Sequence, residues 1–140
     1  MPTRAALATW AGAALRAAGL RHASPQPARL SIRVVGAATS RTLNARYRHK
    51  ERPTNVLSFA GAGALPDGRR DLGELVVCAP VLAREARALG NPRPAHWAHI
   101  VVHGVLHLLG YDHERPREAR RMERREAQIL GSLGFSDPYH

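Results

Sequence analysis

The chain has 140 residues, a length suited to one domain with a buried core, and we predict a single domain over residues 1–140. Its 21 Lys and Arg residues outnumber 11 Asp and Glu, and the resulting net charge of +10 favours a polyanionic partner such as nucleic acid. The alternative is that the positive charge reflects only the composition of an Ala- and Arg-rich chain that prefers Arg to Lys. The only cysteine, Cys78, excludes an internal disulfide and suits a reducing cytosol, and no apolar run is long enough to span a membrane.

Hydrophobic periodicity predicts three strands and five helices. In chain order they are a helix at 4–19, a strand at 29–35, a helix from 39 or 40 to 46 or 47, strands at 54–59 and 73–78, and helices at 80–89, 94–109 and 116–133. The first strand is typical, because Leu30, Ile32 and Val34 alternate with residues of the other face. A Pro-containing turn is expected at 24–27.

Two further segments are expected to be loops. Residues 46–52 hold four basic residues, and the usual meaning of such a run is a solvated surface. Glycines and a proline predict a flexible loop at 61–68. Because helices and strands do not strictly alternate, we predict an α+β fold. In it, a small mixed sheet of about three strands packs with about five helices around the helix at 94–109, which is apolar nearly all round and should be central.

The central helix carries a histidine pattern typical of a metal site. His103 and His107 are four residues apart, so they lie on one helical face. Gly110 tolerates the left-handed conformation that ends a helix and turns the chain back, which allows His113 to reach the same ion. Three protein ligands with one open position are the arrangement of catalytic zinc, and we predict one zinc ion per chain.

Two residues close to this pattern in the sequence have other expected roles. His99 shares the face of His103 but is too far along the axis to share an ion with His107, so we expect it in the wall of the site or supporting a ligand. Asp112 either orients a histidine or caps a turn. The last helix has an apolar stripe with one charged member, and the stripe consists of Ala119, Met122, Glu126, Ile129 and Leu133.

The chain resembles the bacterial YbeY family of metal-dependent endoribonucleases, which are ribosomal RNA maturation factors. The similar segments are His103–His113 (HGVLHLLGYDH), Ala95–His99 (AHWAH), Leu43–Arg48 (LNARYR), Arg52–Phe59 (RPTNVLSF) and Gly134–Tyr139 (GFSDPY). Two features depart from the family. No strand precedes the first helix, so the sheet is expected to lack an edge strand, and Gly73-Glu74 replaces a common Gly-Asp while keeping the charge.

The resemblance implies both the site and the function. It implies His103, His107 and His113 as the metal ligands, usually of zinc, and Arg48 as a catalytic residue for RNA. It further implies a single-strand-specific endoribonuclease that hydrolyses phosphodiesters in ribosomal RNA processing, including maturation of the 16S rRNA 3′ end, and in ribosome quality control. The implied partners are ribosomal RNA and the small ribosomal subunit, without DNA or a membrane, and the implied location is the cytoplasm.

Elementary chemistry is consistent with this interpretation. A metal held by neutral histidines lowers the pKa of a bound water and polarises a phosphoryl oxygen, while the guanidinium of Arg48 can grip phosphate oxygens in bidentate fashion.

Two other functions remain open. A zinc metalloprotease shares the histidine spacing but needs a glutamate where this chain has Gly104. A non-catalytic RNA-binding assembly factor would use the metal only to hold its fold, although closed structural sites normally have four ligands.

Overall fold

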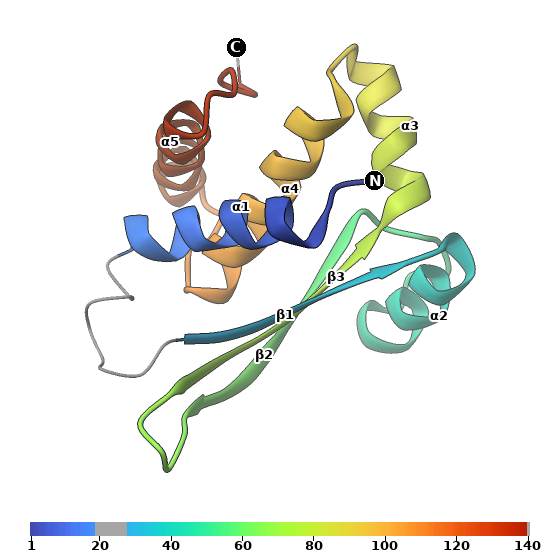
Figure 1. Ribbon diagram of the computed structural model, residues 1–140. Helices are drawn as coiled ribbons and strands as arrows, with labels where there is room; N and C mark the ends of the chain where they lie inside the picture. The colour runs from blue at the N-terminus through green and yellow to red at the C-terminus, as the bar shows by residue number, and fades with distance from the viewer. Residues whose placement is uncertain (19–27, 140) are drawn as a thin grey trace.

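The computed structural model describes residues 1–18 and 28–139 (Figure 1). In chain order the elements are α1 (Arg4–Ala17), β1 (Ala28–Val35), α2 (Ala37–Arg48), β2 (Val56–Ala64), β3 (Arg70–Cys78), α3 (Ala79–Leu89), α4 (Arg93–Leu108) and α5 (Pro116–Ser132). This α+β arrangement confirms the predicted fold class. The expected helix end near residue 19 and the turn at 24–27 lie outside the described residues. None of the described helices is both long enough and apolar enough to cross a bilayer.

The sheet is mixed and has the strand order β1-β3-β2. β3 is central, pairing in parallel with β1 and antiparallel with β2. Leu75 of β3 lies between Ile32 of β1 and Ser58 of β2 and is fully buried. Within the described part of the chain no strand precedes α1, and the outer side of β1 has no strand partner, as expected from the departure noted in the sequence.

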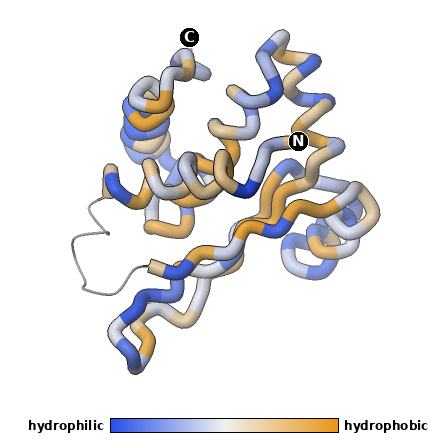
Figure 2. The backbone as a smooth tube through the Cα atoms, viewed as in Figure 1, coloured by the Kyte–Doolittle hydropathy of each residue, from blue (hydrophilic) through white to orange (hydrophobic). Residues whose placement is uncertain are grey.

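The flexible loop predicted at 61–68 is wrong for its first half, because residues 61–64 belong to β2, whereas residues 65–68 do form the turn of a hairpin. β2 continues as far as Ala64, which pairs with Arg70 at the start of β3. A register shift between Ala60 and Gly63 interrupts the ladder without ending it. Glycine is a common component of such bulges, so the residues that suggested a loop instead allow a bend within paired strands. Figure 2 shows hydrophilic residues at the far tip of this hairpin, next to a short hydrophobic stretch.

The predicted bounds of the second helix were also wrong. α2 begins at Ala37, directly after Gly36, and continues through Arg48. Its C-cap, His49, takes the left-handed conformation with φ of 59°. Histidine is among the non-glycine residues that more often adopt this conformation. Arg48 is therefore the last residue of a helix rather than part of a basic loop.

α4 is the central helix, as predicted. It contacts α1, α3, α5 and both strands of the hairpin, and Figure 1 shows α1 crossing it. Its residues Val101, Val102, Val105 and Leu106 are fully buried. Gly104 allows a close approach to the sheet, since a Cβ there would lie 2.8 Å from Cδ2 of Leu75. α3, α4 and α5 begin and end within one residue of their predicted bounds.

Candidate metal centre

The turn after α4 has the form that the sequence predicted. Gly110 has φ of +97°, in the left-handed region. Its N–H donates to the carbonyl of His107 at 3.1 Å, and the N–H of Tyr111 donates to the carbonyl of Leu106 at 3.1 Å. These two bonds make a Schellman motif, which satisfies the last carbonyl groups of a helix and reverses the chain. The chain after Gly110 is thereby directed back along α4.

This reversal brings the three predicted histidines together. The ring centroid of His113 lies 5.4 Å from that of His103 and 5.8 Å from that of His107. Partial burial lowers the pKa of His107, and the nearby His103 and His113 lower it further. A lowered pKa keeps the imidazole neutral, which is the form that binds a metal. The rings thus have the chemistry and the proximity of a ligand set, while their service as ligands stays a prediction.

The three histidines line an open cavity of about 800 Å³ together with Arg48. Arg48 comes from α2, more than fifty residues earlier in the chain, and residues of β2 also line the cavity. Tyr139, near the end of the described chain, also lines it. The resemblance implied that Arg48 acts with the metal site, and in the fold Arg48 lines the same cavity as the three histidines.

The backbone around Arg48 is fixed by contacts on both sides. Nδ2 of the buried Asn44 donates to the carbonyl of Arg52 at 2.8 Å, which ties α2 to the segment that follows it. The rings of Tyr47 and Phe59 meet edge to face with centroids 5.0 Å apart, which ties the same helix end to β2. Arg48 as a residue is solvent-exposed and lines the cavity, so its side chain can meet a charged ligand from a firmly held backbone.

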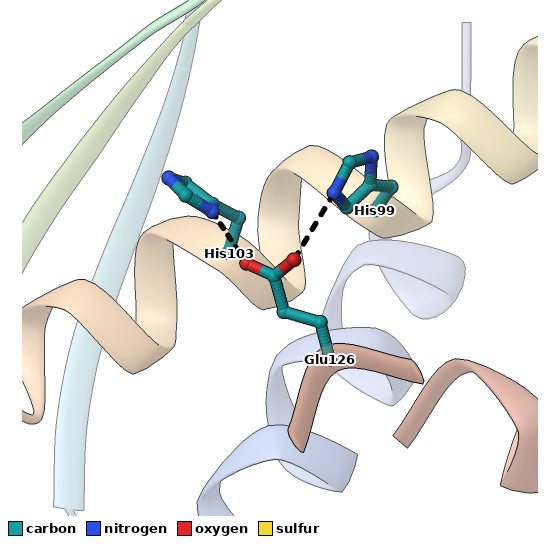
Figure 3. A group of neighbouring side chains, drawn as sticks. All are labelled: His99, His103 and Glu126. Carbon is teal, nitrogen blue, oxygen red and sulfur yellow. Dashed lines mark hydrogen bonds and ion pairs between the residues drawn. The ribbon is translucent and has the colours of Figure 1, made fainter. Parts of the chain in front are cut away.

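A second polar group adjoins the histidines and was not predicted (Figure 3). The carboxylate of Glu126, on α5, accepts hydrogen bonds from His103 Nδ1 and from the Tyr139 hydroxyl. Its Oε2 also lies 3.2 Å from Nε2 of His99. Glu126 is fully buried. The sequence contained one sign of this group, because Glu126 is the single charged residue in the apolar stripe of the last helix. A charge at a position expected to be buried suggests a polar partner inside the fold.

The ionisation of this group follows from its surroundings. Burial by itself raises the pKa of the Glu126 carboxyl, but hydrogen bonds from His103 and His99 outweigh it, and the pKa falls to about 2. Burial, and then the adjoining Glu126 carboxylate, raises the pKa of Tyr139 well above its ordinary value. At neutral pH the carboxylate of Glu126 is therefore ionised and accepts hydrogen bonds, while the phenol of Tyr139 keeps its proton.

His99, His103 and Glu126 form a group that could hold a metal ion. Two ligands of one tetrahedral zinc at 2.0–2.1 Å lie ~3.3 Å from each other. The 3.2 Å between His99 and Glu126 fits that spacing, but the contact between His103 and Glu126 is shorter. The phenol of Tyr139 also occupies one carboxylate oxygen. The geometry therefore fits a hydrogen-bonded carboxylate better than a zinc ligand set, and it leaves Nε2 of His103 free.

The structure also bears on two residues within the motif. Asp112 accepts a hydrogen bond from the backbone N–H of Glu114 at 2.9 Å, and that bond lowers the pKa of its carboxyl. This is the turn-capping alternative. Gly104 is buried against Leu75, so the position of a metalloprotease glutamate faces the sheet and has no room for a carboxylate.

Comparisons with known proteins agree with the resemblance seen in the sequence. Residues 2–134 match the family described as Endoribonuclease YbeY. Relatives of that name include one from Alkalilimnicola ehrlichii, 52% identical over 99% of this chain and 82% of the relative. Another, from Halorhodospira halophila, is 54% identical over 79% of this chain and 73% of the relative. A solution structure of a Thermotoga maritima protein has the same fold, with a TM-score of 0.60 at 22% identity over 99% of this chain and 94% of that protein.

Proposed function

The chain belongs to the family of endoribonucleases called YbeY, and from that premise we propose that it cleaves single-stranded RNA by hydrolysing phosphodiester bonds. The observation that carries the proposal is the shared cavity. His103, His107 and His113 line it from α4 and the turn beyond, and Arg48 lines it from α2. A metal-ligand set and a cation suited to phosphate thus face the same space.

The donor set at this cavity fits one zinc ion. Three imidazoles would hold it, and the open cavity leaves a fourth position for a ligand from solution. When bound, the ion supplies Lewis acidity that lowers the pKa of water and polarises a phosphoryl oxygen.

Arg48 contributes charge stabilisation from the chain itself. Its guanidinium presents planar donors that match two oxygens of a phosphate. Negative charge builds on those oxygens as a phosphodiester is attacked, and a donor held nearby stabilises that charge more than it stabilises the ground state. The fixed backbone at the end of α2 keeps this donor at the cavity that the histidines line.

We also propose ribosomal RNA as the substrate, with processing of the 16S rRNA 3′ end and ribosome quality control as the setting and the small subunit as partner. The net charge of +10 supports binding to a large polyanion, and the sequence segments shared with the family support this substrate. A cytoplasmic location and a single domain over residues 1–140 belong to the same proposal. The free, buried Cys78 is compatible with a reducing compartment.

Single-turnover cleavage of a single-stranded RNA at saturating enzyme tests this function, because it removes differences in affinity. Arg48→Ala should keep its zinc and lose cleavage by about 10²–10³, the usual effect of removing one transition-state donor. His107→Ala should lose both zinc and cleavage.

Arg46→Ala is the matched control, because Arg46 lies on the same helix end, stacks over Tyr47 and does not line the cavity. It should cleave at close to the wild-type rate. If zinc-loaded wild type bound RNA without cleaving it, the chain would instead be the non-catalytic assembly factor. If Arg48→Ala cleaved RNA at the wild-type rate, Arg48 would have no catalytic role.

A further inference from the structure

A buried carboxylate lies behind the histidine that begins the motif. Glu126 is fully buried on α5, on the same face as the buried Met122, Ile129 and Leu130. A leucine could be buried on such a face without a desolvation penalty, whereas burying an ionised carboxylate costs free energy unless its oxygens are hydrogen-bonded. Here three donors from two other segments satisfy it. The cost and the completeness of the pairing suggest a role other than packing.

The donors are divided unevenly between the two carboxylate oxygens. Oε2 meets both Nε2 of His99 and the hydroxyl of Tyr139, whereas Oε1 meets only Nδ1 of His103. The first two contacts hold the carboxylate in place from α4 and from the C-terminal segment. The third contact is then directed at a single nitrogen of a predicted ligand.

An acceptor at this position determines which nitrogen of His103 carries the proton. An ionised carboxylate can only accept, so Nδ1 of His103 must donate. A neutral imidazole has one protonated nitrogen, and the lone pair then lies on Nε2. Figure 3 shows the second nitrogen of the His103 ring on the side away from Glu126. His99 is used differently, because its Nε2 faces the carboxylate.

We propose that Glu126 is a positioning residue that holds His103 as the Nδ1–H tautomer and keeps its Nε2 lone pair free for the metal. His99 and Tyr139 are the residues that hold Glu126 in its orientation. This inference rests on the proposed function, in which His103 is a ligand. It also assigns the group of His99, His103 and Glu126 to hydrogen bonding rather than to a second ion. Such carboxylate–histidine pairs raise the basicity of the ligand and fix its ring.

The first test reads the tautomer directly in the metal-free wild type. Long-range ¹H–¹⁵N NMR of histidine-labelled protein at about pH 8.5, where free imidazole is neutral, distinguishes a protonated Nδ1 from a protonated Nε2. We expect the proton of His103 on Nδ1. A proton on Nε2 would overturn the inference, and this result needs neither a variant nor bound metal.

The second test measures Zn²⁺ affinity by competition with a chromophoric chelator. Glu126→Gln keeps the size of the side chain and removes its charge, and it should bind zinc about 10–100-fold more weakly. Tyr139→Phe removes one supporting donor and should have a smaller effect in the same direction. Unfolding of each metal-free variant is recorded alongside, so that a loss of affinity at unchanged stability identifies positioning rather than folding.

His107→Ala separates this inference from the proposed function. If His107→Ala lost zinc and Glu126→Gln kept wild-type affinity, the metal site would stand and the positioning role would fail. If His107→Ala kept zinc while His99→Ala and Glu126→Gln both lost it, the ion would lie in the group with Glu126. Both the ligand assignment and the inference would then be wrong.

Discussion

Replacing Gly104 by alanine tests how closely the motif helix is seated on the sheet. A Cβ at this position would lie 2.8 Å from Cδ2 and 3.1 Å from Cδ1 of Leu75. Leu75 cannot swing into solvent, because it is fully buried on the central strand. The added methyl group must therefore push α4 away from β3 or force Leu75 out of its rotamer.

Two opposing effects determine how much Gly104→Ala changes the free energy of unfolding. Alanine is favoured over glycine inside a helix by about 1 kcal/mol, while overpacking a close-packed core costs about 1–3 kcal/mol. Gly12 offers a matched control inside α1, since its added Cβ would meet only the end of the exposed, flexible Arg16 side chain at 3.2 Å. Both substitutions gain the preference of alanine for a helix, but only Gly104→Ala also overpacks the core. The Gly104→Ala protein should therefore be less stable than the Gly12→Ala protein by about 1–3 kcal/mol.

Urea unfolding of the metal-free proteins measures this difference. A third variant, Leu75→Val, removes both Cδ atoms, and in that background Gly104→Ala should become neutral or stabilising. The coupling between the two sites should fall within about 0.5–3 kcal/mol, as for residues in contact. If Gly104→Ala stabilised the wild type as much as Gly12→Ala does, the close seating of α4 on the sheet would be refuted.

Two further predictions concern the hairpin and the basic surface. Gly73→Ala should cost on the order of 3 kcal/mol or more, because Gly73 has φ of +122° and its Cβ would lie 1.9 Å from the carbonyl oxygen of Phe59. Gly63 has φ of +76°, but an added Cβ would meet no atom within 4 Å, so Gly63→Ala should destabilise the protein by only about 1–2 kcal/mol. Equal midpoints of thermal unfolding for the two variants would contradict this difference. RNA affinity should fall with salt at a log–log slope of about −0.7 per phosphate contact, and an affinity that does not change with salt would exclude RNA as the main partner.

The sequence predicted those parts of the site that depend on local geometry. The spacing of the histidines and the left-handed Gly110 both follow from helix periodicity and helix ending, and the rings of His103 and His113 are adjacent as expected. Glu126 was missed because its partners come from another helix and from the C-terminal segment, and no local pattern pairs them. Arg48 was placed in a loop because its helix ends at a left-handed histidine, which is a weaker signal than glycine.

The open side of β1 has a consequence for how the molecule behaves at high concentration. Within the described residues this strand pairs on one side only, and Arg29, Ser31 and Arg33 are exposed along it. An unpaired edge is a template on which a second copy can add its own strand. If two such edges met antiparallel about Ser31, each Arg29 would lie opposite an Arg33, and like charges placed opposite each other oppose pairing. In that register the two arginines of β1 would therefore oppose edge-to-edge pairing of two copies.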